Sequence, residues 1–231
     1  MHRGIGRIAA ASAAALGLLA AVAAPAAAQK RGGTIVFVQE APPPTIDPYF
    51  STAVSTRNVA MNIYETLLTR DENNGLIKEL AEDYQVSPDG LTYTFKLRQG
   101  VKFHNGKEMT SADVKASFER YKRMALPKVT LAPVAAFEAP DPYTFVIRLS
   151  KKVPVFLEEM SAFVCPIAIM PAEQGDREGG KVDIIGTGPF QFVEWVADSH
   201  LKLKRFEGYR PDTRYKGTDG FAGRKEVLVD M

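Results

Sequence analysis

The sequence contains very little cysteine and histidine. Among 231 residues there are one cysteine, Cys165, and three histidines. A lone cysteine forms no disulfide within the chain, and a chain of this length can bury enough core to fold without one. Cys165 lies in the apolar run 163–167 with no histidine near it in sequence, so it is predicted to be a buried, inert thiol. A metal site is not expected either, because it needs several clustered ligands.

The motifs of common catalytic sites are also missing. The sequence has no Gly-x-Ser-x-Gly, no Gly-x-x-x-x-Gly-Lys-Ser/Thr and no His-Glu-x-x-His. The glycine-bearing segment 175–181 has the wrong spacing for a phosphate and is typical of a solvated loop. The carboxylate pairs at 82–83 and 158–159 lie on segments predicted to be at the surface, where acid–base catalysis is not expected. We therefore expect no catalytic residue and no cofactor, and binding is the favoured class of function.

Long apolar runs are absent except at the N-terminus. There, Arg3 and Arg7 precede an uncharged run, 8–24, which is rich in alanine and leucine and is followed by Pro-Ala-Ala-Ala at 25–28. A basic start, an apolar middle and a small-residue end are the three parts of a secretory signal peptide in their usual order. Segment 1–28 is therefore predicted to be a signal peptide.

An uncleaved transmembrane anchor is the alternative for this segment. Its apolar run of roughly 17 residues is at the lower edge of what spans a bilayer, and alanine is only weakly hydrophobic. A lipid anchor would need a cysteine after the cleavage point, where Gln29 stands. We expect cleavage after Ala28 and a soluble protein exported to the periplasm.

The mature chain lacks an excess of charge of either sign. Removing Arg3 and Arg7 with the leader balances the remaining basic residues against the 27 acidic ones. A chain of near-zero net charge gives no electrostatic reason to expect binding to nucleic acid or to an anionic membrane. No nucleic-acid partner is expected.

Several segments have the periodicity of helices or strands. The β-branched and aromatic run 34–38 predicts a strand buried on both faces, with prolines 42–44 preventing further pairing. Apolar residues at four-residue spacing predict a helix over 56–68. A capping-box pattern at Thr110 predicts a second helix, which Pro127 ends.

The remaining segments are predicted to be mostly hairpins. Runs of alternating apolar and polar residues flank turn residues in three places, 84–98, 137–149 and 190–206. A short helix is predicted over 154–160, and 226–230 has the composition of a further strand. Because that strand would begin just before the last residue, without its ladder partners, the chain is expected to be part of a longer one.

A set of ordered motifs adds a family resemblance. They are IDP at 46–48, YETLL at 64–68, LAEDY at 80–84, SPDGLTYTFKLRQGVKFHNGK at 87–107, TSADVK at 110–115 and GTGPF at 186–190. Together they resemble the substrate-binding proteins of the peptide/nickel (dipeptide and oligopeptide) family of ABC importers, solute-binding protein family 5. The resemblance covers essentially the whole mature chain. Two features depart from the family: Tyr84 stands where tryptophan is more frequent, and members are more than twice as long.

The resemblance implies a mixed α/β fold of the periplasmic-binding-protein type, class II with an extra domain, and here incomplete. Segments 29–55 and 183–231 would belong to the first lobe, 56–182 would form the additional domain, and the second lobe would lie beyond the sequence. The implied function is capture of a peptide or similar small solute in a cleft between lobes, followed by delivery to the ABC permease subunits. The protein would act as a monomer and not as an enzyme. Lacking half of the cleft wall, this chain would bind solute weakly.

Two other classes of function stay open at this point. An exported adaptor or sensor domain could use the same fold to contact a membrane partner. An exported hydrolase is less favoured, because no nucleophile, base and orienting residue can be assembled from the sequence.

Candidate ligand-binding residues lie in two loops. Segment 40–42 follows the predicted strand 34–38, where α/β sheets place ligands, and its proline fixes an extended backbone that suits a peptide. Tyr49 offers aromatic surface, and Gly188 allows close backbone approach to a ligand or flexing between lobes. Ordinary loop geometry is the alternative at each position. The predicted ligand-binding residues are Glu40, Ala41, Pro42, Thr45, Tyr49, Thr187 and Gly188.

Overall fold

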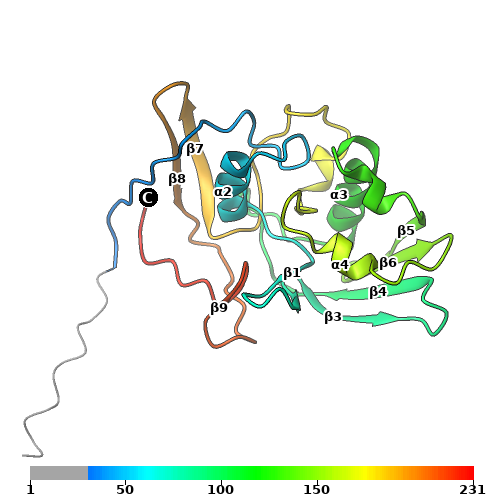
Figure 1. The fold of residues 1–231 in the computed structure, drawn as a ribbon. Coiled ribbons are helices and arrows are strands. Elements are labelled where there is room, and N and C mark those ends of the chain that lie inside the picture. The colour runs from blue at the N-terminus through cyan, green and yellow to red at the C-terminus, as the bar shows by residue number, and fades with distance from the viewer. Residues whose placement is uncertain (1–30) are drawn as a thin grey trace, which may run out of the picture. The chain divides into compact units, whose positions relative to one another are not determined.

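A four-stranded antiparallel sheet organises the larger part of the computed structural model, which describes residues 31–231 (Figure 1). The predicted signal peptide, 1–28, lies outside the described residues. The strand order is β3–β4–β6–β5, with bounds Ala81–Val86, Thr92–Leu97, Thr144–Leu149 and Val134–Asp141. These strands form the predicted hairpins at 84–98 and 137–149, which are confirmed.

Alternation along β4 explains which face of this sheet is buried. Tyr93, Phe95 and Leu97 are buried, whereas Lys96 between them is exposed. Helix α3, Ser111–Met124, covers the apolar face, and its Phe118 packs 4.9 Å from the ring centroid of Phe145. The sheet and α3 therefore share one aromatic core.

Helix α3 begins where the capping-box pattern predicts. The carboxylate of Asp113 accepts the backbone N–H of Thr110 at 2.8 Å, which satisfies a donor at the helix start. Asp113 is fully buried and also binds Lys107 Nζ at 2.8 Å. Because these contacts fix the start of α3, the most recognisable stretch of the sequence is a packing motif.

Helix α2, Val54–Ile63, is shorter than the predicted 56–68. Tyr64 is already extended, and Thr66 bridges to Ala168. The helix ends early because backbone groups beyond it find partners elsewhere: the Thr66 N–H donates to the Glu79 carboxylate at 2.7 Å. The chain continues into β1, Leu68–Arg70, which pairs with β2, Leu76–Lys78.

The remaining elements are short apart from one hairpin. The third predicted hairpin is confirmed as β7, Phe190–Val196, paired with β8, His200–Arg205. The predicted short helix is α4, Phe156–Met160. The other elements are the 3-10 turns η1, Lys128–Leu131, and η2, Ala172–Gln174, and the two-residue strands β9, Thr218–Asp219, and β10, Ala222–Gly223.

The prediction of a buried strand over 34–38 is wrong for the described structure. Side chains 35–38 are between 65% and 85% exposed, and the segment belongs to no sheet among residues 31–231. A strand buried on both faces needs neighbours along its edges and cover on its faces. Here Ile35 donates only to the Met231 carbonyl, at 2.9 Å, and Gly33 accepts from Asp230.

Segment 226–230 is likewise not a strand, contrary to its composition. The end of this segment nevertheless lies between β8 and residues 33–35. On the β8 side, the Arg205 N–H donates to the Asp230 carbonyl at 2.9 Å. The Arg205 guanidinium also pairs with the Asp230 carboxylate at 3.1 Å. The end of β8, residues 230–231 and residues 33–35 are thus hydrogen-bonded in that order.

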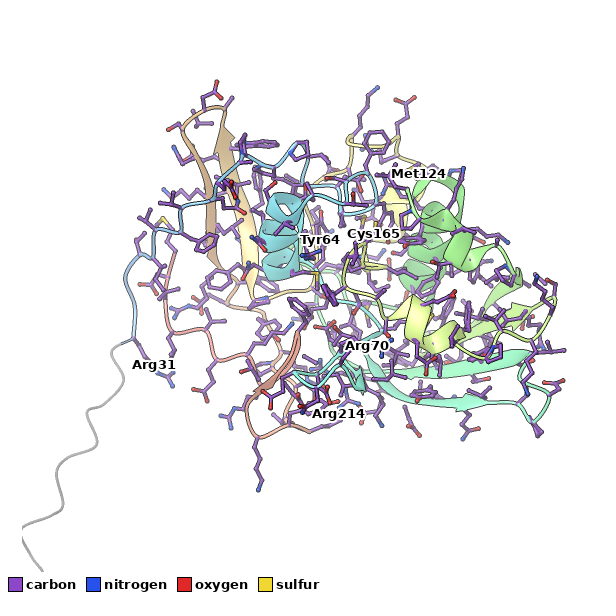
Figure 2. The ribbon with its side chains drawn as sticks, in the orientation of Figure 1. Arg31, Tyr64, Arg70, Met124, Cys165 and Arg214 are labelled. Atoms are coloured by element: carbon purple, nitrogen blue, oxygen red, sulfur yellow. The ribbon has the colours of Figure 1, made fainter. Side chains whose placement is uncertain are left out.

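Residues 33–231 pack around one hydrophobic core. Cys165 is buried in it, as predicted, and lies between α2 and α3 in the view of Figure 2. Burial raises the pKa of its thiol to about 11, which keeps it protonated and unreactive at neutral pH. The division into lobe segments and an additional domain stays a prediction.

Candidate ligand-binding cleft

A cavity of about 1210 Å³ lies between segment 34–43, helix α2 and the β7–β8 hairpin. Its wall includes the exposed chain at Ala41 and Pro42 and the side chain of Trp195 on β7. Trp195 is 40% exposed, so a large aromatic face is open to an occupant. The cavity is large enough for a small solute, and its wall is mixed in polarity as ligand sites usually are.

The predicted residues in segment 40–45 differ in their surroundings. Glu40, Ala41 and Pro42 are exposed, and the last two line the cavity. Thr45 is partly buried, where its Oγ1 accepts the Asp47 N–H at 3.1 Å and its carbonyl accepts Thr56 Oγ1 at 2.8 Å. Thr45 therefore shapes the loop rather than facing the cavity.

Tyr49 lies in the core instead of on a surface. It is fully buried, and its hydroxyl donates to the carbonyl of Ala168. The Arg120 guanidinium carbon lies 5.1 Å from the ring centroid of Tyr49. The two terminal nitrogens of this guanidinium donate to the Asp47 carboxylate at 3.1 and 2.6 Å. The ring therefore offers no open aromatic surface in this structure, and a ligand contact for Tyr49 stays an untested prediction.

Thr187 and Gly188 pass close to the end of helix α2. The Gly188 N–H donates to the Ile63 carbonyl at 2.8 Å. A Cβ on Gly186 would lie 2.1 Å from the same Ile63 oxygen, so this approach requires glycine. Neither Thr187 nor Gly188 lines the cavity, and the structure does not bring them together with Ala41 and Pro42.

Thr187 has an unusual environment. It is 1% exposed, and its Oγ1 has no hydrogen-bond partner among the described residues. Burying a hydroxyl without a partner costs free energy. The contacts of the residues around Thr187 must therefore offset this cost.

His104 holds the 186–188 segment and was not singled out by the sequence. Its Nδ1 accepts the Gly186 N–H at 3.3 Å, and its Nε2 lies 3.0 Å from the Gly188 carbonyl oxygen. This pairing requires a neutral ring protonated on Nε2. Burial lowers the pKa of His104, although the Gly188 carbonyl opposes that shift. No local sequence signal marks the role, because residues 104 and 186 meet only in the fold.

Arg57 on α2 is a second residue that the sequence did not indicate. It lines the cavity, and its guanidinium carbon lies 5.2 Å from the ring centroid of Phe163. Only the three-dimensional path of the chain brings these two residues together.

The described residues show no sign of a metal centre or a membrane span. Residues 31–231 contain no group of three or more histidine, cysteine or acidic side chains placed to hold a metal ion. None of the helices in that range has the length and apolar character needed to cross a bilayer.

Comparison with known proteins places the chain among solute-binding proteins. Residues 75–226 match the model of "Bacterial extracellular solute-binding proteins, family 5 Middle". The glutathione-binding protein GsiB of Escherichia coli K12 is 36% identical over 172 residues, covering 71% of this chain and 33% of that protein. The chain therefore spans about a third of the length of the curated relatives it matches.

Solved structures agree with this assignment. The oligopeptide-binding protein AppA of Bacillus subtilis, in complex with a nonapeptide, has a TM-score of 0.70 at 26% identity, covering 87% of this chain and 39% of AppA. The PBP AgaA from A. tumefacien R10, in complex with agropinic acid, has a TM-score of 0.65 at 33% identity, covering 72% of this chain and 34% of AgaA. The expected family resemblance and the mixed α/β periplasmic-binding-protein fold are both confirmed.

Proposed function

The chain belongs to the bacterial extracellular solute-binding proteins of family 5, and on that premise we propose that it captures a peptide or similar small solute for delivery to the membrane subunits of an ABC importer. The observation that carries the proposal is the cavity beside the exposed segment 40–42. The backbone groups of Glu40 and Ala41 make no backbone hydrogen bond among residues 31–231, so they are available to a peptide main chain.

The similar proteins support this choice of solute class. One is called glutathione-binding, one was solved with a nonapeptide and one with agropinic acid. Glutathione and the nonapeptide are both peptides. We accordingly assign this protein solute binding without catalysis, in the periplasm and as a monomer.

Within this proposal, two groups of predicted residues have different tasks. Segment 40–42 contacts the solute, with Ala41 and Pro42 in the cavity wall. Thr187 and Gly188 act where the chain passes α2, as a pivot on which a second lobe closes over the cleft.

Calorimetric titration with a mixture of short peptides tests the proposal. The protein is the product of the complete gene without its leader. Binding is expected, and it should raise the unfolding temperature, because a ligand that binds only the folded state stabilises it. Ala41→Trp should abolish binding by filling the cavity at an exposed position.

Ala112→Trp is the matched control, because Ala112 is also exposed but lies on α3, outside the cavity wall. It should leave binding unchanged. An adaptor or sensor domain would instead unfold cooperatively and show no heat of binding with any peptide. Equal binding by both tryptophan variants would show that the solute lies elsewhere.

A further inference from the structure

Arg57 is a basic residue that lines the cavity. Its side chain makes no hydrogen bond or ion pair with another residue in the range 31–231, although the residue is partly buried. The other basic side chains of the cavity wall, His200 and Lys202, lie 3.4 and 4.0 Å from the Glu194 carboxylate. Among residues 31–231, Arg57 is thus the basic residue of this wall that has no carboxylate within 4.0 Å.

Aromatic side chains hold the Arg57 guanidinium in place. Its carbon lies 5.2 Å from the ring centroid of Phe163, within the range of a cation–π contact. Phe163 is 40% exposed, and its ring centroid lies 6.2 Å from that of Phe221. Phe221, like Arg57, lines the cavity. Because the ring restricts the guanidinium, less conformational entropy is lost when a ligand binds it.

Arginine in such a setting suits one kind of ligand group. The planar guanidinium presents paired N–H donors that match the two oxygens of a carboxylate. Partial burial beside an aromatic ring reduces competition from water, which strengthens the pairing. The partly buried ring of Phe221, which lines the cavity, would contact an apolar part of the same ligand.

We propose that Arg57 binds a carboxylate of the solute, so that the solute class is a small organic acid such as a peptide with a free C-terminus. This inference rests on the proposed solute-binding function and specifies its substrate class. Arg57 then acts as a specificity-determining residue, and Phe163 as the residue that positions it.

Two matched tripeptide libraries test the inference. Both exclude aspartate and glutamate; one has free C-terminal carboxylates and the other has C-terminal amides. The product of the complete gene should bind the acid library about tenfold more tightly, as expected for a bidentate charged contact. Arg57→Gln should remove that preference while leaving affinity for the amides nearly unchanged.

Two further variants separate charge recognition from packing. Arg57→Lys keeps the charge but loses the paired donors, so an intermediate preference is expected. Arg123→Gln removes an exposed arginine from α3, outside the cavity, and should bind like the wild type. Circular dichroism on each variant confirms that it is folded.

The outcomes distinguish carboxylate recognition by Arg57 from solute binding in general. If the wild type binds both libraries equally, or if Arg57→Gln lowers both affinities by the same factor, the carboxylate role is wrong and solute binding stands. If the wild type binds neither library, the proposed function fails and this inference fails with it.

Discussion

His104 joins two distant parts of the chain through a neutral imidazole. Its ring accepts from Gly186 and faces the Gly188 carbonyl, while Phe206 packs edge-on at 4.9 Å. Burial lowers its pKa below the unfolded value of about 6.5. The unfolded chain therefore takes up this proton at higher pH than the folded one does.

The sign of the resulting pH dependence follows directly. The stability due to neutral His104 is fully present above about pH 6.5 and is lost as the pH falls through the folded-state value. His104→Gln should lower the free energy of unfolding by about 1 kcal/mol at pH 7.5, with a smaller difference at pH 5. Urea unfolding at the two pH values measures this.

His200→Gln is the control for this prediction. His200 is exposed, and among residues 31–231 its side chain makes hydrogen bonds only to Ser199 and the exposed Glu194, so little change in stability is expected at either pH. A difference between wild type and His104→Gln that is the same at both pH values would mean that the ring is not held neutral.

At the scale of elements, helix α2 and the 186–188 segment depend on a close backbone approach. Alanine at 186 would place its Cβ 2.1 Å from the Ile63 oxygen and 2.8 Å from Tyr64 Cδ1. Gly186→Ala should therefore reduce the free energy of unfolding by about 1–3 kcal/mol, the usual cost of overpacking. Gly217→Ala is the control, because nothing lies within 4 Å of its added Cβ.

Denaturant unfolding of both glycine variants distinguishes a steric clash in the folded state from a change in the flexibility of the unfolded chain. Gly217→Ala should change stability by less than about 0.5 kcal/mol. Equal effects of the two substitutions would show that Gly186 acts through the unfolded chain and not through the contact with α2.

Elements defined by local pattern were predictable. The hairpins β3–β4 and β7–β8 follow from alternation and turn residues that lie next to each other in sequence. The start of α3 follows from Thr110 and Asp113 for the same reason. In contrast, the burial of 34–38 depends on neighbours far along the chain. Composition alone predicted a buried strand there, whereas side chains 35–38 are exposed.

The candidate site was predictable only in part. Ala41 and Pro42 line the cavity, as a loop after an apolar run suggested. Tyr49 is drawn into the core by Arg120 and Ala168, which lie 71 and 119 positions away, beyond any local pattern. Arg57 and His104 could not be predicted for the same reason. Their partners, Phe163 and Gly186, are far from them in sequence.

At the scale of the whole molecule, the C-terminal segment is tied to the earlier part of the chain by buried charges. Lys225 Nζ lies 2.7 Å from Glu79 Oε1 and 3.5 Å from Glu65 Oε1, and both carboxylates are almost fully buried. Nearby, Arg214, labelled in Figure 2, donates to the carbonyls of Ala81 and Glu82 at 2.9 and 2.7 Å. These contacts fasten Arg214 and Lys225 to β3 and to the buried Glu65 and Glu79.

Lys225→Met tests how much this fastening contributes. The substitution leaves two buried carboxylates without their cation, so we expect a loss of about 3–5 kcal/mol in the free energy of unfolding. Hydrogen exchange should also show 209–225 opening separately from the main sheet. The exposed Lys216, changed to methionine, is the control and should have little effect.

Acid should partly rescue the Lys225→Met protein. Burial already raises the pKa of Glu65 in the wild type, and Lys225 opposes that shift. Without the lysine the pKa of Glu65 rises further, so lowering the pH protonates this carboxylate and removes an unpaired charge. The deficit should therefore shrink as the pH falls, and Glu65→Gln/Glu79→Gln/Lys225→Met should recover part of it at neutral pH. A deficit that is independent of pH and equal in the triple variant would mean that Lys225 stabilises the fold through its packed side chain and not through its charge.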